Sequence, residues 1–310
     1  MIRAICLNPS IDRSYRIDSF VPGMQYKRMV PEITAGGKGV NVARACSCLG
    51  QRAVLYCFTG GANGRALVSE MSRYCDMIRN VEIEGNSRET INIIDRTSGK
   101  ETEIVEKGPS VSHEQFEHLF SLLEREIVNG DIVVCSGATI EGAPDDVYAQ
   151  ISAICVHKGA HCLLDTNGAV LHRSIGGHYA MWKPNQNELA ELAGSSPSCD
   201  PCTVLSQIER IEGLDSSDVL VSLGAEGGML VNHEGSYLAE VPDVPVVSTI
   251  GCGDSVVAGY AVAMVQGMSV EERLRFSMAC GVVNSASTGI AMIDRNDVDA
   301  VFKEIRIRKI

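Results

Sequence analysis

The chain has 310 residues, of which 45% are hydrophobic, 21% charged and 5% aromatic, and its formal net charge is −12 at pH 7. This acidic balance argues against nucleic-acid binding, which needs a basic stripe on the surface. Small phosphorylated ligands stay open, because a local cluster of cations and backbone N–H groups holds them. The N-terminal apolar run is too short for a signal peptide, and no apolar run reaches the length of about 18 residues expected of a membrane span. The sequence therefore predicts a cytoplasmic protein with no membrane partner.

The length favours one large α/β unit with a small appendage, and we expect residues 1–310 to form a single domain. Most of the twelve cysteines lie inside hydrophobic runs, as Cys6 and Cys135 do. Cysteine in such a context behaves as a small hydrophobe. We therefore expect buried thiols rather than disulfides or zinc ligands.

Short apolar runs alternate with helical patterns along most of the chain. The runs that predict strands are 2–7, 53–58, 132–135, 162–164, 181–182 and 219–223. Between them, the segments 113–128 and 145–158 place apolar side chains on one helical face. Strands separated by helices predict a mainly parallel sheet that is covered on both faces.

Two segments, 14–34 and 81–106, depart from this rhythm. They alternate polar and apolar residues without a helical period, and 97–100 has the composition of a hairpin turn. Together they are expected to form a small β-sheet inserted into the α/β body.

The run Gly251-Cys-Gly-Asp-Ser255 is the strongest local signal for chemistry. It precedes an apolar helix expected over 256–266, and a glycine-rich junction with a helix N-terminus can hold an anion. Asp254 in the first turn is placed to take a proton from a hydroxyl that attacks this anion. The run alone is equally compatible with Asp254 as a helix N-cap. It matches neither a Walker loop nor a dinucleotide fingerprint.

A second glycine-rich run, from Ala35 to Asn41, opens a helix expected to reach 49–50. The glycines around Lys38 allow the backbone to approach a ligand closely, and Lys38 can neutralise a phosphate. Asn41 faces the same side one turn later. The alternative is a flexible helix start with a solvated lysine.

A third run, Lys183-Pro-Asn-Gln-Asn-Glu188, directly follows a predicted strand. Asn185 and Glu188 are spaced i, i+3, so both can reach one point at the helix start, as a hydrated Mg²⁺ requires. The same spacing is a capping box. The two interpretations are compatible.

Three weaker signals complete the pattern. The run from Ser222 to Gly228 is a strand-to-loop turn suited to a nucleotide phosphate. Asp12 follows the first strand, and acidic residues at strand ends often lie in the ligand crevice of an α/β sheet. Arg88, beside the predicted small sheet, is either a phosphate clamp or a solvated surface arginine.

The order of these runs, which begin at Leu7, Gly36, Lys183, Ser222 and Gly251, resembles the phosphofructokinase B family of ribokinase-like carbohydrate kinases over essentially the whole chain. The branch it looks most similar to contains bacterial 1-phosphofructokinase and tagatose-6-phosphate kinase. The resemblance implies a ribokinase-like, Rossmann-type α/β sandwich with a mainly parallel central sheet. It also implies a small β lid, which often pairs two subunits, so we expect a homodimer through the lid.

The resemblance further implies roles for single residues. Asp254 is then the catalytic base, and backbone N–H groups of Gly251, Cys252 and Gly253 form an anion hole. The residues that match the sugar-phosphate site are Asp12, Gly37, Lys38, Asn41 and Arg88. Those that match the ATP site are Lys183, Ser222, Gly224 and Gly227, while Asn185 and Glu188 organise Mg²⁺ indirectly.

The chain departs from the family pattern where Cys252 replaces the usual alanine and where Glu141 adds a negative charge near the expected sugar site. The expected reaction transfers the γ-phosphoryl group of ATP to a ketohexose phosphate. Fructose 1-phosphate, giving fructose 1,6-bisphosphate, is the first candidate acceptor. Tagatose 6-phosphate and fructose 6-phosphate are alternatives, and a non-catalytic sugar-phosphate-binding regulator is the alternative from another class.

Overall fold

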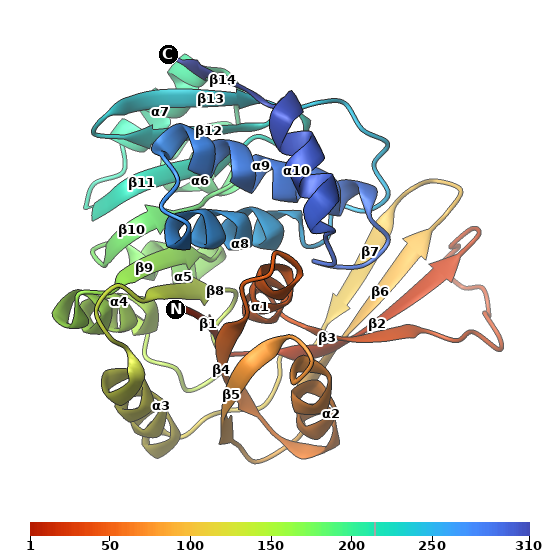
Figure 1. Ribbon diagram of the computed structural model, residues 1–310. Helices are drawn as coiled ribbons and strands as arrows, with labels where there is room; N and C mark the ends of the chain where they lie inside the picture. The colour runs from red at the N-terminus through yellow and green to blue at the C-terminus, as the bar shows by residue number, and fades with distance from the viewer. Residues whose placement is uncertain (214) are drawn as a thin grey trace.

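The computed structural model describes residues 1–213 and 215–310, and their strands form one large and one small sheet (Figure 1). The large sheet has the order β14-β13-β12-β11-β10-β9-β8-β1-β4-β5. Its strands are β1 (Ile2–Cys6), β4 (Ala53–Thr59), β5 (Cys75–Glu82), β8 (Ile132–Ser136), β9 (His161–Asp165), β10 (His178–Trp182), β11 (Asp215–Ser222), β12 (Gly228–Asn232), β13 (Gly235–Glu240) and β14 (Arg306–Lys309).

The strands from β11 through β1 to β5 run parallel, so the prediction of a mainly parallel sheet is confirmed. Strands β12, β13 and β14 extend it with antiparallel pairs. The sequence prediction missed these three strands. In β13 and β14 polar residues interrupt the apolar ones, whereas β12 contains the short apolar run 229–231, a signal that could have predicted it.

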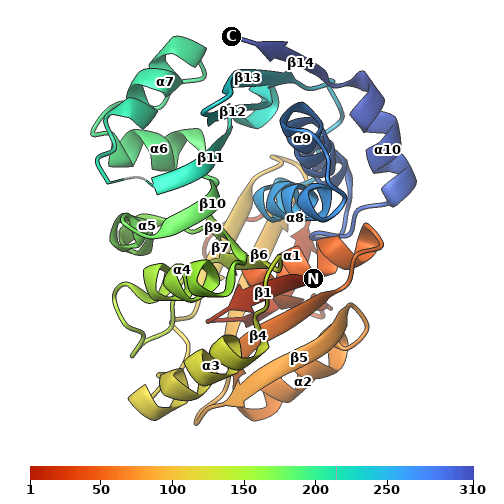
Figure 2. The same cartoon turned by 60° about the vertical axis from the view of Figure 1, so that its left-hand side comes forward.

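Helices cover both faces of the large sheet (Figure 2). One layer contains α1 (Lys38–Cys48), α2 (Gly61–Met71), α8 (Cys252–Val265), α9 (Val270–Ala286) and α10 (Arg295–Glu304). The other contains α3 (His113–Glu126), α4 (Val147–Lys158), α5 (Gly168–Ser174), α6 (Gln186–Leu192) and α7 (Pro201–Glu209). Alternate residues of β1 enter opposite cores, since Ile2 and Ala4 pack under the first layer and Ile5 under the second.

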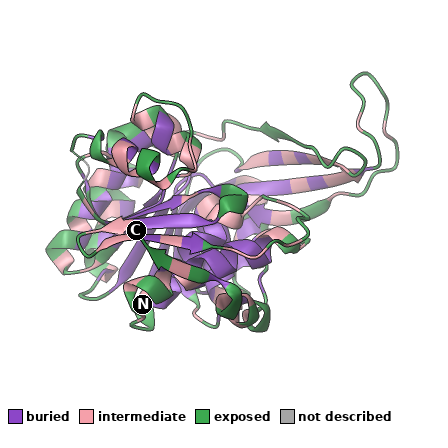
Figure 3. Ribbon diagram, turned by 90° about the horizontal axis from the view of Figure 1, so that it is seen from above, coloured by how far each residue is buried: buried purple, intermediate pink, exposed green. Residues whose placement is uncertain are grey.

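The small sheet projects from this body and has the order β3-β2-β6-β7 (Figures 1 and 3). Its strands are β2 (Ser10–Ile17), β3 (Glu32–Gly36), β6 (Arg88–Asp95) and β7 (Glu101–Val105). It starts at Ser10 rather than at residue 14, and Val81 and Glu82 belong to β5 in the large sheet instead. Among the polar contacts that join it to the body, Arg16 donates to the Thr288 carbonyl at 3.1 Å, and the Ser248 hydroxyl donates to Glu101 at 2.9 Å.

The carboxyl ends of the parallel strands share one edge, where the glycine-rich runs also lie. The chain passes from β1 to β4 on one side and returns to β8 on the other, so the strand order reverses beside β1. Ligands of open α/β sheets bind at such a point. Among the described residues, no helix is long and apolar enough to cross a bilayer. Eight cysteines are buried as predicted, whereas Cys48, Cys199 and Cys252 are half-buried and Cys202 is exposed.

Candidate active site

Asp254 lies at the start of α8, whose first residue is Cys252. Gly251 is the N-cap residue and has the left-handed φ of 80°, which glycine adopts without strain. The Asp254 side chain caps nothing; its Oδ2 accepts a 2.8 Å hydrogen bond from Asn41 Nδ2. The N-cap interpretation of Asp254 is therefore wrong, and its buried carboxylate lies in the first turn of α8.

The turn before α8 is held in place by Asn284 from α9, which is 1% exposed. Asn284 Nδ2 donates to the Ile250 carbonyl at 2.8 Å and to Cys252 Sγ at 3.2 Å, while its Oδ1 accepts from Ala291 N at 2.8 Å. The sequence analysis missed Asn284. An asparagine inside a long helix carries no motif, and its partners lie in distant parts of the chain.

Asp165, the last residue of β9, joins two of the predicted lysines. Its Oδ1 accepts from Lys38 Nζ and from Lys183 Nζ, each at 3.2 Å, and its side chain is fully buried. Lys38 is thus paired rather than solvated, which overturns that alternative. The sequence analysis also missed Asp165, although it carries the same strand-end signal that singled out Asp12.

These charges determine the protonation of the site. Burial and the neighbouring Asp165 raise the pKa of Asp254 to about 6, although Lys38, Asn41 and Lys183 act in the opposite direction. Burial also opposes the charge of Asp165, but the two lysines outweigh it and lower the pKa of that carboxyl group. Asp254 is therefore a carboxylate near neutral pH and still retains useful basicity, as a general base requires.

Asp12 and Arg88 lie on the face of the small sheet that is turned toward this edge. Ser10 donates to Asp12 Oδ1 at 2.6 Å, and a Cβ atom at Gly36 would lie 2.0 Å from the Asp12 carboxylate, so only glycine fits there. Burial raises the pKa of Asp12 although Ser10 and Arg88 lower it. The half-buried Arg88 donates from Nε to the Asn8 carbonyl at 3.0 Å, so it is not a freely solvated arginine.

The polar side of the small sheet continues beyond Asp12. Thr90 lies opposite Asp12 in the next strand, and its neighbour one strand further out is Val105. Glu103 lies nearby, since burial, and then repulsion from Asp12, raise the pKa of its carboxyl group. This region therefore contains two carboxyl groups, a hydroxyl group and a guanidinium.

On the other side of Asp254, Asn185 and Glu188 form a complete capping box at the start of α6. Asn185 Oδ1 accepts from the backbone N–H of Asn187 and Glu188, both at 2.9 Å, and Glu188 Oε2 accepts from Asn185 N at 2.8 Å. The capping interpretation is confirmed. The Ser222 N–H donates to the Pro184 carbonyl at 3.1 Å, which places the next glycine turn beside this helix start.

That turn is closed by a hydrogen bond from the Leu223 N–H to the Gly227 carbonyl at 2.9 Å. Gly224 and Gly227 both have positive φ, 65° and 90°. The predicted residues thus meet at one edge of the large sheet, with Asp12 and Arg88 on the side of the small sheet. Lys183 and the 222–227 turn lie on the opposite side, and Asp254, Lys38 and Asn41 lie between.

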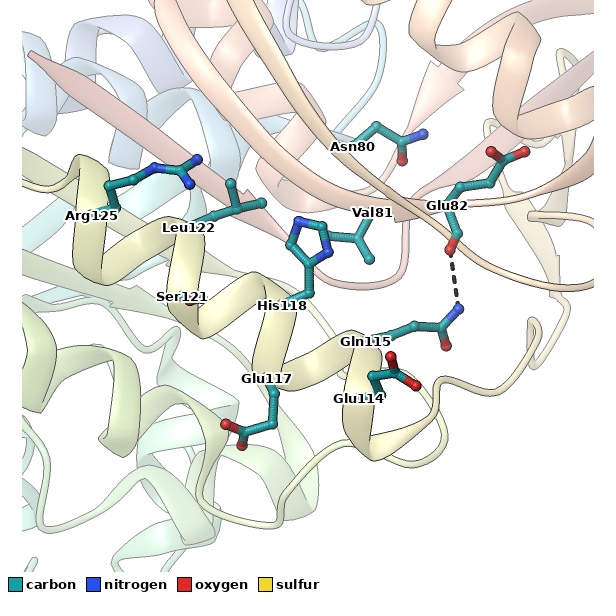
Figure 4. A pocket seen from close by; sticks show the side chains of 10 residues that line it. All are labelled: Asn80, Val81, Glu82, Glu114, Gln115, Glu117, His118, Ser121, Leu122 and Arg125. Atoms are coloured by element: carbon teal, nitrogen blue, oxygen red, sulfur yellow. Dashed lines mark hydrogen bonds between the residues drawn. The ribbon is translucent and has the colours of Figure 1, made fainter.

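A separate polar cavity of about 630 Å³ lies between β5 and α3 (Figure 4). Its lining includes Glu82, Glu117, His118 and Arg125, and Gln115 Nε2 donates across it to the Glu82 carbonyl at 3.0 Å. None of the predicted site residues lines it. It is therefore separate from the site around Asp254.

The chain is similar along its length to known carbohydrate kinases. The chain is 30% identical over 309 residues to a tagatose-6-phosphate kinase of Staphylococcus epidermidis, with 99% of each chain covered. Phosphofructokinase-2 of Escherichia coli, solved with fructose-6-phosphate, matches with a TM-score of 0.88 and 28% identity over 98% of each chain. Arabidopsis thaliana ribokinase, at 23% identity, covers 97% of this chain and 98% of its own with a TM-score of 0.77, and so shares the fold.

The family model described as pfkB family carbohydrate kinase matches residues 6–294, which is most of the chain. Together with the relative that is similar along its full length, this match establishes the family. The protein belongs to the pfkB family of carbohydrate kinases.

Proposed function

We propose that this sugar-phosphate kinase, a phosphotransferase with an alcohol group of a sugar as acceptor, transfers the γ-phosphoryl group of ATP to the free primary hydroxyl of a ketohexose monophosphate. Fructose 1-phosphate, which would give fructose 1,6-bisphosphate, is the acceptor the sequence favours first. Tagatose 6-phosphate is the second candidate, supported by the relative that is 30% identical over 309 residues.

The observation that carries this proposal is the placement of Asp254. The acceptor hydroxyl gives its proton to Asp254 as its oxygen bonds to the γ-phosphorus, and the bond from that phosphorus to the β,γ-bridging oxygen breaks to release ADP. The backbone N–H groups of Gly251, Cys252 and Gly253 at the start of α8 stabilise the charge that builds on the transferring group. Phosphoryl transfer depends mainly on such positioning and electrostatics.

The geometry refines the role of Lys38. The sequence assigned Lys38 to the existing phosphate of the sugar, but its ammonium shares Asp165 Oδ1 with Lys183 from the ATP side. Burial opposes its charge, yet the carboxylates of Asp165, Asp254 and Glu188 keep its pKa above the ordinary value. We therefore place Lys38 beside the transferring phosphoryl group. Arg88, oriented by the Asn8 carbonyl, then binds the existing phosphate, because guanidinium matches phosphate geometry.

The donor set around α6 fits a hydrated magnesium ion. No group of three His, Cys, Asp or Glu side chains that could hold a metal occurs among the described residues. Magnesium in kinases instead keeps several waters and binds substrate phosphates with one or two carboxylates. Glu188 uses Oε2 for the capping box, which leaves Oε1 for a water ligand. When bound, Mg²⁺ would neutralise charge on the ATP phosphates; Asn185 and Glu188 would hold its water shell.

A coupled assay of ADP release tests the acceptor. Purified protein with Mg²⁺ and ATP should turn over at least one of fructose 1-phosphate, tagatose 6-phosphate and fructose 6-phosphate, with the highest kcat/KM for fructose 1-phosphate. Unphosphorylated fructose should react much more slowly, because Arg88 then has no phosphate to bind. A higher kcat/KM for tagatose 6-phosphate would replace the first acceptor with the second. Binding of one sugar phosphate with no turnover of any would support the non-catalytic regulator instead.

We further propose that the small sheet pairs two copies of the chain. A row of side chains crosses its four strands on the face opposite Asp12: Ile33, Arg13, Ile91 and Ile104 are directly paired neighbours. Ile33 and Ile104 are 52% and 54% exposed, which is high for apolar residues in regular strands. A second copy packed on this row would bury them.

Sedimentation equilibrium tests the pairing. The wild-type protein should have the mass of a dimer at micromolar concentration, and Ile33→Asp combined with Ile104→Asp should give a monomer, because packing would bury two unpaired carboxylates. Val156→Asp, an exposed apolar position on α4, serves as the matched control and should stay dimeric. A monomeric wild type, or a dimer that survives the double substitution, would rule out this interface.

A further inference from the structure

Arg44, on α1, is a buried arginine that the site described above does not include. Its side chain is 2% exposed, and acceptors from four segments surround its guanidinium. Nη1 donates to Asn41 Oδ1 at 3.0 Å and to the Ile290 carbonyl at 3.3 Å. Nη2 donates to the Ala35 carbonyl and to Glu70 Oε1, the latter at 3.3 Å. A cation this deeply buried needs such partners to be tolerated.

The contact with Asn41 fixes the direction of an amide. A guanidinium has only donors, so the Asn41 atom that faces Arg44 has to be the oxygen. The amide nitrogen then faces Asp254, to whose Oδ2 it donates at 2.8 Å. If the amide turned over, its oxygen would point at the Asp254 carboxylate and repel it. Arg44 therefore excludes the unfavourable orientation of the Asn41 amide, because its guanidinium can only donate hydrogen bonds. This effect does not depend on how tightly the Asn41 side chain is packed.

The same guanidinium anchors the beginning of α1. Ala35 lies in β3, an outer strand of the small sheet, and precedes the Gly36–Gly37 turn that leads to Lys38. Arg44 holds the Ala35 carbonyl, and Glu70 Oε2 accepts from the Ala35 N–H at 2.7 Å. Because Arg44 and Glu70 also bind each other, the two side chains fix both backbone groups of this residue. Arg44 thus fixes the position of Asn41 relative to Asp254 in two ways: by its direct hydrogen bond to Asn41 and by holding the strand that leads into α1.

We propose that Arg44 is a positioning residue for the reaction: by holding Asn41 Oδ1 it makes the Asn41 amide donate to Asp254, and so sets the proton affinity of the base. This inference rests on the proposed role of Asp254. The charged groups that face Asp254 are Lys38 from α1, Asp165 from β9 and Lys183 after β10. None of them is changed by a substitution at Arg44, so a change in the pH profile reports either the Arg44–Asn41 link or the loss of the guanidinium charge, and a double variant separates the two.

The first test is the acid limb of kcat/KM, which reports the protonation of the base in the free enzyme. Arg44→Met should move its midpoint to higher pH by about one unit, because the carboxylate loses a hydrogen bond that favours its charged form. Asn41→Ala should move the midpoint in the same direction and by a similar amount. Asn41→Ala removes the residue that links Arg44 to Asp254, so the test stays valid even if Arg44→Met folds poorly.

The double variant separates action through Asn41 from loss of a positive charge. If Arg44 acts through Asn41, then Arg44→Met adds no further shift in the Asn41→Ala background. A full additional shift in the double variant would show a direct charge effect and overturn the proposal, as would an unshifted midpoint in Asn41→Ala. Arg3→Met is the matched control: Arg3 is a buried arginine of β1 that donates to Asp131 and Tyr56. It should lower stability and leave the midpoint unchanged.

A readout without turnover distinguishes failure of this inference from failure of the proposed function. The carboxyl carbon of Asp254 in protein labelled with carbon-13 aspartate, assigned by its absence in Asp254→Asn, titrates whether or not any sugar reacts. Its pKa should rise in Arg44→Met and in Asn41→Ala. If wild-type protein phosphorylates no sugar yet this pKa rises in both variants, the link stands and only the catalytic role of Asp254 falls. If sugars react but the pKa is unchanged, the link itself is wrong.

Discussion

Replacing Asp254 by asparagine is expected to lower kcat by about 10²–10⁴-fold, the usual contribution of a general base. The amide cannot accept the proton of the attacking hydroxyl. It has about the same size as the carboxylate, and Asn41 beside it is unchanged. Affinity for ATP should change little, because the turn at 222–227 and Lys183 are untouched. Steady-state kinetics and calorimetric titration with ATP measure the two quantities. Turnover near the wild-type value would exclude Asp254 as the base.

The pH dependence sharpens this prediction. With a pKa of about 6 for Asp254, wild-type kcat/KM should fall as the pH drops through that value, and the residual activity of Asp254→Asn should lack this limb. The stability of the fold depends on pH in the opposite direction to kcat/KM. A carboxyl group with a raised pKa stabilises the fold fully at low pH and loses that contribution as the pH rises through about 6. The variant should therefore melt at a higher temperature than wild type at about pH 8, with no such gain at about pH 4.

Replacing Asp165 by asparagine should have the largest effect on stability. Two ammonium groups would lose the buried carboxylate they share, and removing one partner of a buried ion pair typically costs about 3–5 kcal/mol. The KM for ATP should rise as well, because Lys183 and Lys38 lose the atom that holds them in place. Urea unfolding near neutral pH and initial-rate kinetics measure both effects.

The pH dependence of this loss follows from the lowered pKa of Asp165. Its contribution is present above the ordinary carboxyl value of 3.8 and is lost as the pH falls through the lower value of the folded state, so the difference between wild type and variant should shrink in acid. Asp131→Asn is the matched control, because Asp131 is a buried carboxylate paired with Arg3. It should weaken the fold without changing the KM for ATP. Equal stability of wild type and Asp165→Asn would show that the ion pairs of Asp165 with Lys38 and Lys183 do not stabilise the fold.

Much of the architecture could be predicted because it is encoded locally. Buried parallel strands such as β4 and β8 contain continuous apolar runs, and the period of α3 is plain in the sequence. The C-terminal end of α3 lies less than one turn before the predicted one, because Ile127 has an extended backbone and ends the helix. Strands β13 and β14 were missed because polar residues interrupt their apolar ones, whereas the apolar run 229–231 in β12 could have been recognised.

The sequence motifs predicted the residues at the centre of the candidate site, but not the residues that hold them in place. Gly251 and Asp254 stand in a run whose chemistry can be read from neighbouring residues. Asp165 and Asn284 act through contacts with residues far away in the sequence, and only the folded topology brings those partners together. Arg44 contacts Asn41 one turn earlier in α1, but its partners Glu70 and Ile290 come from distant segments. Arg44 also follows two small apolar residues in a helix, a pattern that gives no sign of a buried guanidinium.

The carboxylate that Lys38 and Lys183 share has a consequence for how this scaffold changes in evolution. One lysine follows the glycine turn next to the small sheet, and the other follows β10 in the middle of the large sheet. A substitution that displaces either ammonium alters the surroundings of the other through a single oxygen atom. We therefore expect substitutions that change acceptor preference without disturbing this lysine pair to lie at positions that do not reach Asp165, such as Thr90 and Glu103.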